Sequence, residues 1–250
     1  MELDVLSIGL VIAAAFGTAV FHSVGGFAGG LLLAICLAPI LGVKETVPVT
    51  AAAMIVSNSA RTWAFRKAVH WRVFLCIFAA ALPGIVAGAV IYITLPVHVV
   101  ALVLGIFLIV SVPLRRVMAA KEFRIRYRGL AVAGLPYGLV SGTTFGAGMM
   151  LAPFLLGAGL MGETLVATIA ALGFGLNLTK SVVFGLSPLL DATLAAKGAL
   201  IGLFTIPGAF VGRWIVRSTP IRIHTVFMEL FVLAGAGYFL WHAAQGFGLR

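Results

Sequence analysis

Acidic residues are scarce in this chain of 250 residues, which has 7 Asp and Glu against 17 Lys and Arg. Charged residues of both signs make up only 10% of the sequence, whereas about 25% is usual in a soluble domain. So few charges cannot cover a water-exposed surface, so the composition excludes an ordinary soluble domain. The shortage of carboxylates also disfavours an active site built on a pair of acids.

Cysteine and catalytic motifs are equally rare. The two cysteines, Cys36 and Cys76, both lie inside apolar runs, and the sequence has no CxxC or HExxH motif. A disulfide scaffold and a zinc site are therefore not supported, and we expect neither a metal nor a cofactor. The sequence also has no GxSxG and no GxxxxGK[ST] motif, which argues against an enzyme and against a self-contained ATP-driven pump.

Long apolar runs are what the sequence has in abundance, since 62% of its residues are hydrophobic. A membrane-spanning helix needs roughly 20 apolar residues, and a β-barrel would instead give short alternating strands. We therefore expect an all-α, polytopic integral membrane protein with about ten hydrophobic segments. The acidic start "MELD" does not resemble a signal peptide. The runs are 5–21, 31–43, 46–60, 73–93, 97–114, 129–140, 145–161, 164–179, 199–212 and 223–241.

The positive charges are concentrated in short connections. The net charge is +10, and most of it falls in "RTWAFRKAVHWR" (61–72) and "RRVMAAKEFRIRYR" (115–128). Short basic connections are typical of cytoplasmic loops. The charge therefore indicates a protein oriented in a lipid bilayer, and not a nucleic-acid-binding protein.

Four motifs occur twice in the same order. Pro-Gly-x3-Gly-x7-Pro begins at Pro83 and again at Pro207, and Asn-x2-Arg/Lys-Thr/Ser-x2-Phe begins at Asn58 and again at Asn177. The other pairs are "GGLLLAICLAP" with "AGMMLAP" and two Glu-Thr pairs. This order predicts an internal duplication. We expect a first repeat at 1–114, a basic cytoplasmic linker at 115–128 and a second repeat at 129–250.

Charge also bears on the orientation of the repeats. Five segments per repeat would place the copies in opposite orientations. The connection 61–72 is basic and its counterpart 184–197 is not, while 94–98 has no basic residue and its counterpart 213–222 has three arginines. This exchange favours inverted repeats with short or broken helices. Counts over the whole chain do not separate the inverted from the parallel layout.

Glycine clusters precede two short apolar segments. "GGFAGG" (25–30) and "GTTFGAG" (142–148) hold equivalent places in the repeats. Loosened backbone inside a bilayer requires a packed or cavity-lining position, and the exposed N–H groups of the following helix attract anions. Close helix packing is the alternative. The substrate-shaping candidates are Gly25, Gly26, Gly29, Gly30, Gly142, Gly146 and Gly148.

Polar residues within the apolar runs complete the candidate substrate site. Each Asn-x2-basic motif places an amide and a cation one helical turn apart, and such donors suit an anion pathway. The alternatives are that the cationic side chains extend to the nearest membrane surface and that the amides only join neighbouring helices. The donor candidates are Ser57, Asn58, Arg61, Thr143, Thr144, Asn177 and Lys180.

Two titratable residues are candidates for ion coupling. Glu229 lies midway along the last apolar run and either carries a proton or forms a buried ion pair. His22 can titrate near neutral pH, and the alternative is a polar cap at a helix end.

One glycine-rich stretch, with a second version at 141–190, resembles the sulfite exporter TauE/SafE family of membrane permeases. The stretch reads "VGGFAGGLLLAICLAPILGVKETVPVTAAAMIVSNSARTWAFRKAVHWR". The likeness covers nearly the whole chain, although "GTTFGAG" is less glycine-dense than "GGFAGG". The resemblance implies a bacterial permease for sulfite, sulfonates or other sulfur-containing organic anions.

Together these observations predict a multi-pass secondary transporter, an exporter of small anions, in the bacterial inner membrane. It would work by alternating access and be driven by a proton or sodium gradient. An anion channel, a membrane-embedded enzyme and a membrane subunit without transport activity are the alternatives. The oligomeric state is left open, with a homodimer as one alternative.

Overall fold

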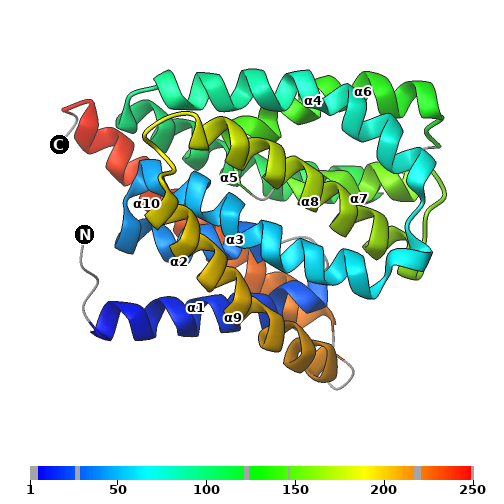
Figure 1. The fold of residues 1–250 in the computed structure, drawn as a ribbon, viewed down its shortest axis with the longest axis horizontal. Coiled ribbons are helices and arrows are strands. Elements are labelled where there is room, and N and C mark those ends of the chain that lie inside the picture. Colours follow the sequence, from blue (N-terminus) through cyan, green and yellow to red (C-terminus); the bar gives the residue numbers. More distant parts are fainter. Residues whose placement is uncertain (1–4, 26–28, 121–123, 146, 217–220, 249–250) are drawn as a thin grey trace.

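The computed structural model describes residues 5–25, 29–120, 124–145, 147–216 and 221–248, and within them the fold is all-helical. Ten α-helices and one short 3-10 turn, η1, make up this part of the chain (Figure 1). The helices match the ten predicted apolar runs. Their bounds are α1 Val5–Gly25, α2 Gly29–Leu41, α3 Val43–Ala64, η1 Arg66–Ala68, α4 Trp71–Thr94, α5 Val97–Ala120, α6 Tyr127–Thr143, α7 Gly148–Gly157, α8 Gly162–Gly185, α9 Ala192–Val216 and α10 Ile221–Gly246.

Equivalent helices of the two halves make equivalent contacts with helices of the other half. Helix α4 of the first half packs along α6, and α9 of the second half packs along α1. Likewise α4 contacts α8 as α9 contacts α3, and α5 contacts α7 as α10 contacts α2. In Figure 1 the α4–α6 pair and the α1–α9 pair form opposite edges of the molecule. Two copies related by a two-fold axis would give this pattern of contacts.

The third helices of the two halves run antiparallel. Phe65, just after α3, and Glu163, in the first turn of α8, line the same cavity. At the other end the Tyr92 hydroxyl donates to the Val43 carbonyl oxygen at 3.3 Å, and the Tyr92 ring lies 5.4 Å from that of Phe184, near the end of α8. The start of α3 therefore lies beside the end of α8. Opposite directions for these counterparts are what inverted repeats require.

The last helices of the two halves are antiparallel as well. Arg116, late in α5, pairs with Glu229, early in α10. Gly105, in the middle of α5, lies against Leu240, late in α10. These contacts join α5 and α10 along their length in opposite directions, as α3 and α8 are joined.

Glycines allow the closest helix contacts. A Cβ added to Gly138 of α6 would overlap the Ala81 carbonyl of α4, and one added to Gly142 would lie 2.5 Å from the Ile85 carbonyl oxygen. The Pro-Gly-x3-Gly motif supplies the facing surface on α4, where a Cβ on Gly84 would overlap α6. Gly208 in the second copy of the motif meets α1 in the same way. The repeated motif is therefore a packing device for these two helix pairs.

The outer surface suits a bilayer. The helices at Trp71–Thr94, Val97–Leu114 and Gly162–Gly185 are long and apolar enough to span a membrane, with mean hydropathies of 2.5, 2.7 and 1.5. Large apolar side chains such as Val132 and Phe210 are exposed. Trp63 is also exposed and lies under the guanidinium of Arg66 in η1, 4.6 Å from its ring centre. Tryptophan beside basic residues is typical of a membrane–water interface.

Helical structure extends into segments expected to be irregular. Helix α5 continues to Ala120 and α6 begins at Tyr127, so much of the basic segment 115–128 is helical. Helices α2 and α7 also continue past their internal prolines, Pro39 and Pro153, and end at Leu41 and Gly157. Proline accepts the helical φ angle, so the helix can continue past it. Because proline also removes a backbone donor and crowds the preceding turn, each helix ends within a few residues of its proline.

The contact between α4 and α6 gives a stability prediction. Replacing Gly138 by Leu forces a side chain into the backbone of α4, and overpacking of this kind costs roughly 1–3 kcal/mol or more. We expect a thermal unfolding temperature in detergent lower by several degrees. Gly237→Leu is the matched control, because a Cβ there meets nothing within 4 Å. Equal unfolding temperatures for the two variants would contradict this packing.

Candidate functional site

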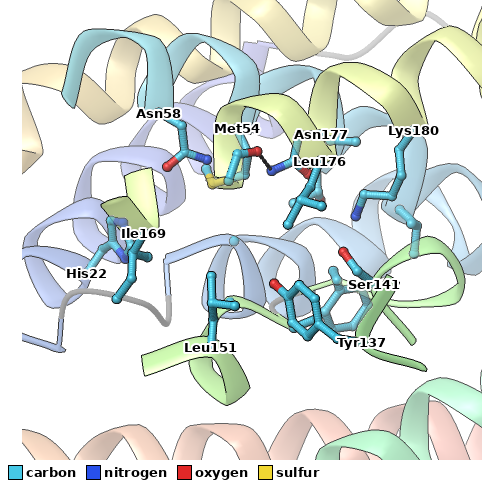
Figure 2. A pocket seen from close by; sticks show the side chains of 18 of the residues that line it. His22, Met54, Asn58, Tyr137, Ser141, Leu151, Ile169, Leu176, Asn177 and Lys180 are labelled. Carbon is cyan, nitrogen blue, oxygen red and sulfur yellow. Dashed lines mark hydrogen bonds between the residues drawn. The ribbon is translucent and has the colours of Figure 1, made fainter. Parts of the chain in front are cut away.

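A cavity of about 70 Å³ lies among helices of both halves (Figure 2). It has room for about two water molecules, at roughly 30 Å³ each. The wall combines polar groups with an apolar surface. The lining residues are His22, Gly30, Val47, Thr50, Ala51, Met54, Asn58, Arg61, Tyr137, Ser141, Phe145, Ala147, Gly148, Leu151, Ile169, Gly173, Leu176, Asn177 and Lys180.

Two cations reach the cavity from equivalent positions. Arg61 on α3 is in hydrogen-bond contact, through Nη1, with Nε2 of His22 in the last turn of α1. The buried Lys180 on α8 donates from Nζ to the Thr144 carbonyl oxygen at 3.2 Å, just after α6. Arg61 therefore lies at the C-terminal end of α1, and Lys180 at the C-terminal end of α6. We call α1 with α2, and α6 with α7, the interrupted helices of the two halves. Carbonyl groups and the helix dipole favour positive charge at that end.

The two asparagines meet at one glycine of α8. Asn177 donates from Nδ2 to the Gly173 carbonyl oxygen at 2.7 Å. Asn58 approaches the same glycine from α3, and a Cβ on Gly173 would lie 2.8 Å from its Nδ2. Glycine at this position therefore leaves room for the Asn58 amide at the cavity wall.

One hydroxyl of the wall has no hydrogen-bond partner in the described part of the chain, and other buried polar groups lie beside it. The Thr50 hydroxyl is buried without a hydrogen bond to any described residue. Asn58, Tyr137 and Ser141 are also buried, at 8%, 7% and 4% exposed, and line the same wall. An unsatisfied buried polar group costs about 1–3 kcal/mol. A polar guest in the cavity would satisfy this hydroxyl.

The polar groups converge on the cavity from two sides. In Figure 2, Asn58, Asn177 and Lys180 approach from one side, and Tyr137 and Ser141 point toward them from the other. Because these residues come from α3, α8 and α6, the wall combines both halves of the molecule. A relative movement of the halves would therefore change the cavity.

Two helix N-termini add to the positive potential. Gly30 and Gly148, within the first turn of α2 and α7, line the cavity. The Gly29 N–H donates to Nδ1 of His22 at 2.8 Å, which ties the start of α2 to the end of α1. The chain is not helical at 144–145 and at 147, between α6 and α7. The positive ends of two short helices therefore face the same space.

No carboxylate lines this cavity among the described residues. The wall has a guanidinium group, an ammonium group, two amides and several hydroxyls, which supply hydrogen-bond donors. Such a set can hold a small anion, because both charged groups among the described lining residues are positive.

The structure brings about half of the predicted substrate residues to this cavity. Gly30, Asn58, Arg61, Gly148, Asn177 and Lys180 line it, together with the coupling candidate His22. Gly25 and Gly29 end α1 and begin α2 beside it without lining it. Gly26 and Gly146 lie outside the described residues. The substrate-binding role of these residues stays a prediction.

The other described residues of the predicted substrate site do not line this cavity. Gly142 packs against α4, so it follows the helix-packing alternative. The Thr143 and Thr144 hydroxyls donate to the Val140 carbonyl oxygen, at 3.2 and 2.6 Å. They satisfy their own helix end, as threonine hydroxyls often do. Ser57 lines a neighbouring cavity instead.

Glu229 takes part in an ion pair. Its carboxylate accepts from Nε of Arg116 at 3.1 Å and from Nη2 of the same side chain. It does not line the polar cavity. The structure shows an ion pair that links α10 to α5, although its Arg116 side chain is 67% exposed and the pair is therefore not fully buried.

Tyr137 is a polar lining residue that no feature of the sequence marks. It lies in "GLPYGLV" without a polar neighbour or a repeated counterpart, so no pattern marks it. Ser141 is one helical turn further along α6 and shares its face. The polar face of α6 is visible only once the packing of α6 is known.

Comparison with known protein families gives one result that covers most of the chain. The family model described as "Sulfite exporter TauE/SafE" matches residues 11–239. Comparison with curated proteins and with solved structures gave no match. The match extends from α1 to α10 and includes all residues of the polar cavity. This chain therefore belongs to the sulfite exporter TauE/SafE family, and it is a multi-pass membrane transporter, not an enzyme.

Proposed function

We propose that the protein is a secondary transporter of the bacterial inner membrane that exports sulfite or a related sulfur oxyanion by alternating access. The observation that carries this proposal is the polar cavity itself. It collects Arg61, Lys180, two amides and two helix N-termini, with no carboxylate among its described lining residues. The family's printed name, sulfite exporter, agrees with this chemistry.

The geometry supports a binding mode for the oxyanion. Arg61 and Lys180 approach the cavity from the two halves, so an anion between them would be attracted to both. Asn58, Tyr137 and Ser141 place an amide and two hydroxyl groups at the wall. Their groups replace part of the water shell that the anion loses. Binding between the halves also gives the substrate a direct influence on their relative position.

Access to the cavity supports export. Arg61 also lines a larger cavity that extends to Phe65, next to the basic turn Arg66–Ala68. Basic connections face the cytoplasm, so this larger space lies toward the cytoplasmic side. An exporter loads its substrate from that side. Because α3 and α8 run antiparallel, we expect an equivalent route past Lys180 to open on the opposite side during transport.

His22 is the favoured coupling group, which makes the driving ion a proton. Its Nδ1 accepts the Gly29 N–H and its Nε2 faces Nη1 of Arg61, which can only donate, so donors approach both ring nitrogens. Full protonation would place a proton on Nδ1, break the bond to α2 and place another positive charge beside Arg61. Protonation would therefore change both the helix break and the attraction for the anion.

Removing either asparagine amide should slow transport. We expect Asn58→Ala and Asn177→Ala each to reduce sulfite flux in proteoliposomes about tenfold or more, because a hydrogen bond to a charged group contributes about 1.5–3 kcal/mol. Gln245→Ala, at an exposed amide outside the cavity, is the control. Full flux in the folded double variant would remove both residues from the site.

Replacing His22 tests proton coupling. In His22→Asn we expect an imposed pH gradient to stimulate sulfite flux less than twofold, while sulfite counterflow without a gradient continues. The side chain of Asn cannot take up the second proton. The measurement is sulfite uptake with and without the gradient, alongside a parallel sodium gradient. Unchanged stimulation by the pH gradient, or stimulation by sodium alone, would contradict proton coupling through His22.

A further inference from the structure

The repeated motif of an asparagine and a cation ends in a phenylalanine that the proposed function leaves without a role. This residue is Phe65 in the first half and Phe184 in the second, each four residues after its cation. One helical turn therefore separates Arg61 from Phe65, and Lys180 from Phe184. Because α3 and α8 run antiparallel, the two phenylalanines lie beyond the cations toward opposite ends of the molecule.

Phe184 lies in the apolar core, where it is 0% exposed. Its ring centre is 5.4 Å from that of Tyr92, which is late in α4 and also buried. Both side chains belong to one apolar cluster with Val47 and Phe145, which line the polar cavity. Packed side chains therefore occupy the space beyond Lys180, between the polar cavity and the end of α4.

Hydrogen bonds hold this end of the molecule closed. The Tyr92 hydroxyl donates to the Lys44 carbonyl oxygen at 3.0 Å, and Nζ of Lys44 donates to the Leu95 carbonyl oxygen at 2.9 Å. These bonds join the start of α3 to the end of α4. Helix α4 begins next to the basic turn η1, so its other end lies away from the cytoplasmic side.

Phe65 has different surroundings. It follows the last residue of α3, is partly exposed, and lines the larger cavity of about 430 Å³ that also reaches Arg61. The start of α8, with Glu163, and helix α9, with Phe210, line the same cavity. In the repeats α8 corresponds to α3, and α9 corresponds to α4. The larger cavity therefore separates Phe65 from the counterparts of the elements that enclose Phe184.

We propose that Phe184 and Phe65 are the two gates of the transport pathway, with Phe184 closed and Phe65 open in this structure. The inference rests on the proposed function, because a gate has a role only if an anion passes through the polar cavity. When the two halves exchange conformations, Phe65 packs against α9 and the start of α8, and Phe184 leaves α4. The anion then reaches the polar cavity from the other side.

The chemistry of the closed end suits a gate. A layer of packed apolar rings excludes water and a hydrated anion. Because both halves have the same phenylalanine beside a cation, the packing lost at one end is replaced by packing at the other. A permanent core contact is the competing explanation for Phe184, and such a contact does not separate during transport.

Crosslinking the closed end provides the test. The native cysteines are first replaced, as Cys36→Ala and Cys76→Ala. Lys44→Cys and Leu95→Cys are then joined by a short, reducible bifunctional thiol reagent, and sulfite flux in proteoliposomes is measured before and after reduction. We expect the joined protein to lose most of its flux and to regain it on reduction, because this end opens in every cycle. Full flux in the joined protein would overturn the proposal.

A second pair at the same end of the molecule is the matched control. The rings of His98, at the start of α5, and Phe247, just after α10, lie 4.6 Å apart. Neither is among the described residues that line the two cavities. Joining His98→Cys to Phe247→Cys should leave sulfite flux unchanged. Equal loss of flux from both pairs would overturn the assignment of the gate to the end of α4.

Alanine variants test the phenylalanines themselves. Without one gate the pathway can be open at both ends, so sulfite flux in Phe65→Ala and Phe184→Ala should rise in proportion to sulfite concentration and not saturate. Phe247→Ala is the matched control and should remain saturable. Phe65 is partly exposed, so its variant decides the test if Phe184→Ala does not fold. Saturable flux in the folded Phe65→Ala protein would overturn the proposal.

The same measurements separate the two proposals. If joining Lys44→Cys to Leu95→Cys leaves sulfite flux unchanged, the polar cavity remains the proposed anion site and only the gate is removed. Absence of sulfite flux in the unmodified protein means that the proposed transport function has failed, and the gate proposal with it.

Discussion

The fold depends on keeping two cations inside a membrane protein. A charged side chain within the bilayer is costly unless the protein or water compensates it. Arg61 contacts His22 at the end of α1, and Lys180 donates to the Thr144 carbonyl after α6. The interrupted helices supply this compensation, because their C-terminal ends carry partial negative charge. The same interruptions leave the N-termini of α2 and α7 facing the cavity, so one device both holds the cations and completes the anion site.

Close packing allows the interruptions to persist. An interrupted helix loses backbone hydrogen bonds. Lipid cannot satisfy the freed N–H and C=O groups, so such a helix must be packed against other parts of the protein. Helix α6 gains these contacts along α4, where Gly138 and Gly142 bring the two backbones together, and α1 gains them along α9 at Gly208. The glycine-rich sequence therefore serves two purposes. Gly138, Gly142 and Gly208 hold the interrupted helices against a partner, whereas Gly30, Gly148 and Gly173 are the described glycines that line the cavity.

The sequence predicted the helices and part of the site because their signals are local. Ten apolar runs gave ten helices, and the spacing of Asn58 with Arg61, and of Asn177 with Lys180, placed each amide and cation on one face. Tyr137 could not be predicted, because its role depends on how α6 packs. The sequence placed Gly142 and Thr143 in the site because both belong to the second glycine-rich stretch. In the structure the Thr143 hydroxyl donates to a backbone carbonyl of α6, and Gly142 packs against α4. Periodicity identifies a polar face, whereas tertiary packing decides what that face meets.

The central claim is that the two cations bind an anion between the halves of the molecule. Sulfite binding to the purified protein in detergent, followed by calorimetry, tests it most directly. The measurement compares the unchanged protein with Lys180→Met, which keeps the length of the side chain and removes its charge. The account predicts at least a tenfold weaker dissociation constant for the variant, from the loss of a charge-assisted contact worth about 1.5–3 kcal/mol. The same affinity in a folded Lys180→Met protein would contradict it.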